Sequence, residues 1–287
     1  MCLYQKVCRD WLEFCYCDQE HKDTFSSPVY GECGYNKVGK EAVALSEEGK
    51  KEEEEELSSP DPVESLENGY SESLTGNFPR SENGYRHGDR LRDSYRELYL
   101  RLDTEVIRPC LAIASRALQL QPGSELGSVW FREGPGAYQL RLAHYVLSAG
   151  GGGGGDSLLY GEHTDYDGLT FLWRNRFNGL QARVEGRWAD IPLLETDPDA
   201  LLINLGDLME FWTRSAWHSP LHRVVRSTTG DCPPSDLVSV VMFAGPHPHT
   251  SLTALPSPLL PPSSPGDSLV TAGQHVRTKI GRTGVAA

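Results

Sequence analysis

A histidine and an aspartate stand two residues apart in the segment "GEHTDYDGLTFLW" (161–173), and these side chains could bind a metal ion. Residues i and i+2 of a strand point to the same face, so His163 and Asp165 would present an imidazole and a carboxylate together. This spacing alone is more often found in a surface strand with two polar residues. A third candidate ligand, His222, lies in "HSPLHRVV" on another predicted strand. Two histidines and one carboxylate leave part of a metal's coordination sphere open, which suits non-haem Fe(II), although zinc and manganese also accept such ligands.

The elements that must position these residues are mainly short strands. In "YQLRLAHYV" (138–146), apolar and polar residues alternate with the two-residue period of a strand. The later candidates are separated by turn signals such as Asp167-Gly168 and Asn178-Gly179. They are "LTFLW" (169–173), "GLQARV" (179–184), "ALLINL" (200–205), "LHRVV" (221–225) and "LVSVVMF" (237–243). Short strands without alternating helices predict an antiparallel sandwich or barrel.

Helices are expected before and after these strands. Apolar residues recur three or four apart over 90–120, which predicts a long amphipathic helix with a kink at Pro109. A short helix is expected at 272–281. The charge run "KKEEEEE" (50–56), before the first of these helices, and the six glycines 150–155, after it, favour solvated, flexible loops.

Composition narrows the class of partner. The net charge of −13 over 287 residues argues against nucleic acid or an anionic membrane, because both require a basic face. The seven cysteines lack the paired spacing of a zinc module, and no apolar run reaches the roughly 18 residues of a membrane span. We therefore expect a monomeric cytoplasmic protein with reduced thiols and a small-molecule partner.

The motifs, taken in order, resemble a known family. "HTDYDGLTFLW", "RWADIP", "NLGDLMEFWT" and "LHRVV" are similar to the barrel of the isopenicillin N synthase-like family of Fe(II)/2-oxoglutarate-dependent oxygenases. The resemblance implies a mainly β fold with flanking helices, a double-stranded β-helix or jelly-roll barrel preceded by a helical N-terminal region. It also implies an iron ion held by His163, Asp165 and His222, with 2-oxoglutarate and O2 as co-substrates.

The same resemblance divides the chain and assigns the co-substrate residues. The expected parts are an unmatched segment 1–33, an N-terminal region 34–130 with an acidic loop (45–60), a jelly-roll domain 131–250, and a loop with a closing helix 251–287. Tyr145 and Ser239 match the family residues that bind the far carboxylate of 2-oxoglutarate. The family arginine two residues before that serine is Leu237 here, which removes a bidentate carboxylate partner.

Three interpretations of Leu237 follow. Another cation could serve, and Arg141 and Arg226 are the candidates, although rim charge is the commoner role for an arginine. Alternatively, the protein does not use 2-oxoglutarate, or it binds metal without catalysis. On the family pattern, the main prediction is a dioxygenase that hydroxylates or desaturates a small molecule.

Overall fold

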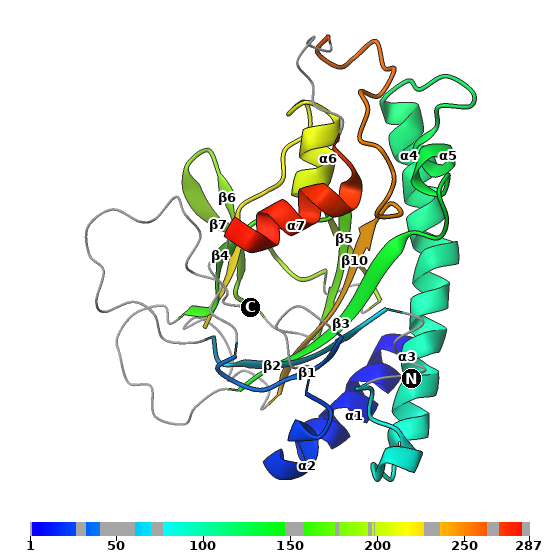
Figure 1. Ribbon diagram of the computed structural model, residues 1–287. Coiled ribbons are helices and arrows are strands. Elements are labelled where there is room, and N and C mark those ends of the chain that lie inside the picture. Colours follow the sequence, from blue (N-terminus) through cyan, green and yellow to red (C-terminus); the bar gives the residue numbers. More distant parts are fainter. Residues whose placement is uncertain are drawn as a thin grey trace.

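The computed structural model, shown in Figure 1, describes most of the chain. The described residues are 2–26, 33–40, 61–69, 77–146, 158–175, 178–194, 197, 199–226, 236–262 and 270–282. The predicted acidic loop at 45–60 and the glycine run at 150–155 lie outside these ranges.

Helices lie before, between and after the strands along the chain. They are α1 (Leu3–Cys15), α2 (Gln19–Asp23), η4 (Ser81–Asn83), α3 (Gly88–Arg101), the π-helical η5 (Leu102–Ile107), α4 (Arg108–Ala117), α5 (Leu126–Trp130), α6 (Asp207–Trp212) and α7 (Ala272–Arg282). The strands are β1 (Gly34–Asn36), β2 (Val63–Asn68), β3 (Ala137–Tyr145), β4 (Leu158–His163), β5 (Leu169–Arg174), β6 (Leu180–Val184), β7 (Arg187–Asp190), β8 (Leu202–Leu205), β9 (His222–Val225) and β10 (Leu237–Gly245).

The strands form two antiparallel sheets. The larger sheet has the order β1-β2-β3-β10-β5-β8 and the smaller one β4-β9-β6-β7. Every pairing within them is antiparallel, as expected when strands follow one another without intervening helices. The expected mainly β fold with flanking helices is therefore confirmed.

The register of the larger sheet decides which side chains share a face. On β10, Ser239 is opposite Ala143 of β3 and Arg174 of β5, while Val241 is opposite Arg141 and Leu172. Directly opposed residues of antiparallel strands point to the same side. One face of this sheet therefore carries a polar group from each of three neighbouring strands.

The predicted long helix is present as three joined parts, α3, η5 and α4. Its buried residues include Leu91, Tyr95 and Leu98, whose three- and four-residue spacing gives the helix an apolar side. The irregular part is the π-helical η5, immediately before Pro109 in the first turn of α4. Proline is tolerated there because a first-turn residue needs no intrahelical N–H bond.

The helices cover distinct parts of the sheets, as Figure 1 shows: α3 and α4 run along one side of the molecule, while α6 and α7 lie at the other end of the strands from α1. Helix α1 packs on α3 and on the larger sheet through Trp11 and Phe14, which are fully buried. Among the described residues, no helix is both long enough and apolar enough to cross a membrane.

A smaller apolar group, here called the inter-sheet cluster, joins the two sheets. It consists of Val63, Ala143, Tyr145, Leu159, Leu180, Val224 and Leu237. Its members come from β2, β3 and β10 of the larger sheet and β4, β6 and β9 of the smaller one. Leu237 is completely buried within it.

Candidate metal centre

The two candidate histidines lie opposite each other on neighbouring strands of the smaller sheet. His163 ends β4, His222 begins β9, and the two residues are register partners. The Nε2 atoms of His163 and His222 lie 3.9 and 3.8 Å from Oδ1 of Asp165. One ligand atom from each residue falls within 4.8 Å of the others, so three donors converge on one point. The structure thus brings together the three residues that the sequence suggested.

The orientation of both imidazoles is set by main-chain carbonyls. Nδ1 of His163 is 2.8 Å from the carbonyl oxygen of Gly161, and Nδ1 of His222 is 3.0 Å from that of Pro220. A carbonyl can only accept, so Nδ1 carries the proton and Nε2 keeps its lone pair. In each ring the nitrogen that faces Asp165 is therefore the one able to bind a metal.

The carboxylate of Asp165 is held from its other side. Nδ2 of Asn204, on β8, donates to Oδ2 of Asp165 at 2.6 Å, which leaves Oδ1 toward the histidines. The main chain supports this position, because the N–H of Asp207 donates to the carbonyl oxygen of Asp165 at 2.7 Å. Such outer contacts fix the geometry of a ligand before any metal arrives.

Electrostatics favour the metal-binding protonation states. Burial, with the neighbouring His222, lowers the pKa of His163 to about 3, so this imidazole is neutral near pH 7. Burial opposes ionisation of Asp165, but the two histidines and the Asn204 amide outweigh it and lower the pKa of this carboxyl. The neutral imidazole of His163, the imidazole of His222 and the carboxylate of Asp165 match the donor set of a two-histidine, one-carboxylate Fe(II) site with open positions.

A cavity of about 420 Å³ opens beside these three residues. The larger sheet contributes Arg141, Tyr145 and Ser239, and helix α7 contributes Val276. Much of the remaining wall is apolar and includes Leu172, Ile191, Leu202, Ile203, Val241 and Phe243. The candidate metal ligands thus border a chamber of the size and character of a small-molecule site.

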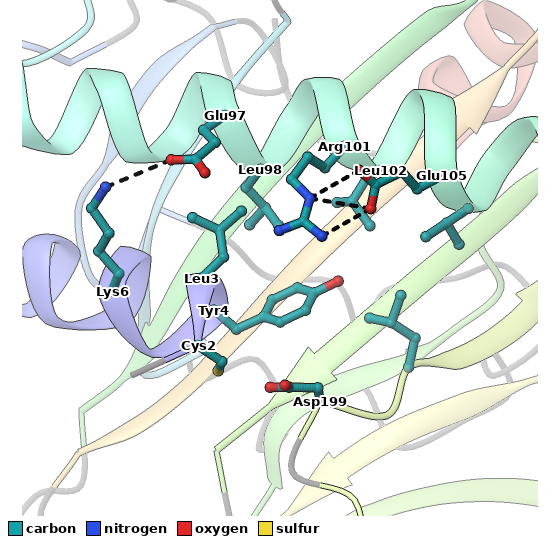
Figure 2. Close-up of a pocket in the computed structure, with 12 residues that line it drawn as sticks. Cys2, Leu3, Tyr4, Lys6, Glu97, Leu98, Arg101, Leu102, Glu105 and Asp199 are labelled. Atoms are coloured by element: carbon teal, nitrogen blue, oxygen red, sulfur yellow. Dashed lines mark hydrogen bonds and ion pairs between the residues drawn. The ribbon is translucent and has the colours of Figure 1, made fainter.

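A second cavity, shown in Figure 2, shares no lining residue with the first. It measures about 590 Å³ and lies between the start of α1, helix α3 with η5, and the segment around Asp199. Its basic side chains are already paired, Lys6 with Glu97 and Arg101 with Glu105. It contains none of the clustered ligand atoms found among the described residues.

Comparison with known proteins shows which family this part of the chain resembles. Residues 119–251 match the family model described as the 2OG-Fe(II) oxygenase superfamily, and this segment contains all three candidate ligands. This segment, a little under half of the chain, is similar to the members of that superfamily. The family resemblance predicted from the sequence is confirmed, and Fe(II) and 2-oxoglutarate are the cofactors of that superfamily.

Relatives in this superfamily agree in sequence and in fold. Gibberellin 2-beta-dioxygenase 2 of Arabidopsis thaliana is 28% identical over 161 residues, 56% of this chain and 45% of that protein. The crystal structure of a full-length Neurospora crassa protein in complex with alpha-KG matches with a TM-score of 0.74 at 20% identity, covering 97% of this chain and 82% of that one. JOX2, in complex with 2OG, Fe and JA, matches with a TM-score of 0.67 at 18% identity, covering 96% and 77%.

The two kinds of match differ in extent. The chain spans less than half the length of the curated relatives that it matches, 43% of one and 45% of another. The structural matches, at 20% identity or less, show a shared oxygenase fold and nothing finer.

The four residues expected to bind the co-substrate differ in their position relative to the cavity. The hydroxyls of Tyr145 and Ser239 are 3.5 Å apart at the cavity wall. Arg141 also lines the cavity, but its guanidinium is 3.5 Å from the carboxylate of Glu67. Arg226 follows the last residue of β9 and is not a lining residue. Of the two cations proposed to replace the family arginine, only Arg141 reaches the chamber.

Two residues beside the site were not foreseen. Asn204 holds Asp165, and Arg174 is opposite Ser239 in the sheet. Strand alternation could have indicated the face on which each residue lies. Arg174 is on the same face of its strand as Thr170 and Leu172, and Asn204 is on the same face as Leu202. What alternation could not supply is the identity of the neighbouring strand.

Proposed function

We propose that this protein is an Fe(II)- and 2-oxoglutarate-dependent dioxygenase that oxidises a C–H bond of a small molecule. The observation that carries the proposal is the convergence of His163, Asp165 and His222 beside a mostly apolar cavity of about 420 Å³. The similarity of residues 119–251 to the 2OG-Fe(II) oxygenase superfamily supports it. We also propose that the two sheets close into a double-stranded β-helix barrel over residues 131–250, flanked by regions 34–130 and 251–287.

The three ligands fit the metal that the superfamily uses. His163, Asp165 and His222 would hold Fe(II) through two imidazole nitrogens and one carboxylate oxygen, leaving sites open for 2-oxoglutarate and O2. When bound, the iron couples conversion of 2-oxoglutarate and O2 to succinate and CO2 with insertion of one oxygen atom into the substrate, or with desaturation. Asn204 keeps the carboxylate aligned, and the carbonyls of Gly161 and Pro220 keep both histidines in the metal-binding tautomer.

The remaining cavity residues would bind the organic co-substrate and the substrate. The hydroxyls of Tyr145 and Ser239 are suited to donate hydrogen bonds to the far carboxylate of 2-oxoglutarate. The apolar wall, with Ile203, Phe243 and Val276, would exclude water and pack on an apolar part of the substrate. Related structures contain small molecules, such as JA with JOX2, which supports a small-molecule substrate here. A monomeric, cytoplasmic enzyme remains a prediction from the sequence.

A turnover assay that needs no knowledge of the substrate tests the proposal. Anaerobically Fe(II)-loaded protein is mixed with 2-oxoglutarate and O2, and succinate and CO2 are measured, because many oxygenases of this chemistry consume some co-substrate without substrate. We expect slow, equimolar formation of both products, lost in Asp165→Asn and retained in His218→Ala, whose side chain is 76% exposed. Metal binding without succinate, repeated across a panel of candidate substrates, would instead indicate a catalytically impaired protein.

A further inference from the structure

We propose that Arg174 supplies the positive charge that binds the far carboxylate of 2-oxoglutarate, in place of the arginine that Leu237 replaces. The inference rests on the proposed function and names a binding residue on a different strand from the family arginine. It follows from the packing of Leu237, from the strand register around Ser239, and from the bonding of the Arg174 guanidinium.

The side chain of Leu237 can form neither a hydrogen bond nor an ion pair, and other side chains enclose it. The side chain is completely buried in the inter-sheet cluster, against neighbours such as Leu159 and Val224. Its register partner on β3 is Tyr145, so it occupies the same end of the sheet as the co-substrate hydroxyls. If 2-oxoglutarate binds at this end of the sheet, its far carboxylate would be buried without a cation unless another residue supplies one. Burying an unpaired negative charge costs free energy.

Arg174 lies at this end of the sheet. It is the register partner of Ser239, so the two side chains leave the sheet on the same side from adjacent strands. Leu172 and Thr170, two and four positions earlier on β5, also point to this side, and both line the cavity. Arg174 is not itself a lining residue, but it is opposite Ser239 and bonds to Ile191, which both line the cavity.

The guanidinium of Arg174 is incompletely satisfied. Nη2 donates to the carbonyl oxygen of Ile191, which is uncharged. Nη1 is buried and has no hydrogen-bond partner. Within the described part of the chain no carboxylate pairs with Arg174. Burial lowers the pKa of Arg174, and the only opposing influence is Tyr145, which places this hydroxyl near the guanidinium. A partly buried guanidinium whose buried Nη1 lacks a partner is a group that an incoming carboxylate would satisfy.

The other arginines near the cavity already have acidic or polar partners. Arg141 pairs with Glu67 and lies over the ring of Tyr160. Arg223 pairs with Glu162 and stacks on Trp188. A carboxylate of 2-oxoglutarate would have to displace an acidic partner from Arg141 or Arg223. At Arg174 it would have to replace only the carbonyl oxygen of Ile191.

The test compares two ligands on metal-loaded protein without oxygen. Protein with Mn(II) in place of Fe(II) is titrated by calorimetry with 2-oxoglutarate and with 2-oxobutyrate, which has the same 2-oxo acid but no far carboxylate. We expect Arg174→Gln to weaken 2-oxoglutarate binding by at least about thirtyfold. Binding of 2-oxobutyrate should change by less than about threefold, because the lost contact involves only the missing group. Arg174→Lys should lie between wild type and Arg174→Gln, since lysine keeps the charge but not the bidentate fork.

Matched variants make the result specific. Arg141→Gln should bind 2-oxoglutarate more tightly than Arg174→Gln does. Adding Leu237→Arg to Arg174→Gln should restore at least about tenfold of the lost affinity, because it returns a guanidinium to the same end of the sheet. Thermal unfolding and 2-oxobutyrate binding identify variants whose site has collapsed.

The possible contrary results are distinct. Equal 2-oxoglutarate affinity in wild type and Arg174→Gln would overturn the assignment and leave the proposed function standing. Loss of both ligands in both Arg174 variants, with wild-type thermal stability, would also overturn it. Failure of the wild-type, Mn(II)-loaded protein to bind 2-oxoglutarate at all would overturn the proposed function as well.

Discussion

His163 and His222 face each other across β4 and β9, with their ring centroids 4.1 Å apart. Both rings direct Nε2 toward Asp165, and their Nδ1 atoms are occupied by main-chain carbonyls. The convergence of the three candidate ligands is thus a property of strand pairing and local main-chain contacts.

Replacing His222 with alanine should abolish tight binding of a divalent metal. Two ligands would remain, and the open position would admit water in place of an imidazole. Titration with Mn(II) or Co(II), followed by calorimetry, measures the loss. Wild-type protein should also gain about 3 kcal/mol of stability at a metal concentration about a hundredfold above Kd, a gain absent from the variant. His218→Ala is the matched control, and equal metal affinity in both variants would remove His222 from the site.

Replacing Asn204 with aspartate should weaken metal binding by about ten- to a hundredfold without changing the ligand set. The new side chain has nearly the same shape, but it cannot donate to Oδ2 of Asp165 and places a second negative charge beside it. Competition with a chelator of known affinity gives the difference. Gln181→Glu is the control, because it breaks a similar amide–carboxylate bond, to Asp190, on the exposed surface. An unchanged affinity in Asn204→Asp would mean that this hydrogen bond does not align Asp165.

Glu64 should make protein stability depend on pH in acid. Burial opposes its ionisation, but hydrogen bonds from His144, Lys22 and Tyr35 outweigh this and lower the pKa of Glu64 to about 2. Because the folded pKa lies below the unfolded value, the contribution is complete above about pH 4.5 and is lost as pH falls toward 2. Glu64→Gln should therefore cost about 2 to 3 kcal/mol near neutral pH, and less as the pH is lowered. Urea unfolding of the wild-type protein and of Glu64→Gln between about pH 2 and 7 measures this cost. A difference in the free energy of unfolding that does not change with pH would contradict the role given to Glu64.

Leu237→Ala should reduce the free energy of unfolding by about 2 to 5 kcal/mol. The residue is completely buried in the inter-sheet cluster, so truncation leaves a cavity between the two sheets. Leu194→Ala is the control, because that side chain is 63% exposed and its loss should cost less than about 0.5 kcal/mol. Denaturant unfolding measures both. Equal costs would show that the cluster around Leu237 does not join the sheets as described.

Lys279→Met should loosen helix α7 without affecting metal binding. Nζ of Lys279 is 2.9 Å from Oδ2 of Asp207 at the start of α6, and Val276 of the same helix lines the cavity. Breaking one partly exposed ion pair costs about 1 kcal/mol or less, enough to raise local opening several-fold. Amide hydrogen exchange over 272–279 should accelerate while Mn(II) affinity stays constant. Unchanged exchange would mean that this ion pair does not limit the local opening of α7.

Much of the architecture could be predicted from the sequence because its signals are local. The three- and four-residue apolar spacing over 90–120 predicted the helix seen as α3, η5 and α4. Two-residue alternation predicted β3, and the short apolar segment 237–243, set off by turn signals, predicted β10. The expected helix at 272–281 is α7, Ala272–Arg282. His163, Asp165 and His222 were also named from the sequence, since strand parity and motif order identify them without a structure. The helices, the strands and the His163–Asp165 pair depend on residues close together in the chain, whereas His222 was identified from its place in the order of motifs.

Local sequence patterns were enough to locate the long helix, most strands of the two sheets and the candidate ligands, but the neighbours of those ligands depend on the tertiary fold. Arg174 became a neighbour of Ser239, and Asn204 a partner of Asp165, through pairing of strands that are distant in sequence. Leu237 marked a missing cation, but the sequence directed attention to Arg141 and Arg226. Which cation is near a site and still unpaired depends on strand register and on competing partners such as Glu67. Those are long-range properties, set by the packing of the whole fold and not by any local pattern.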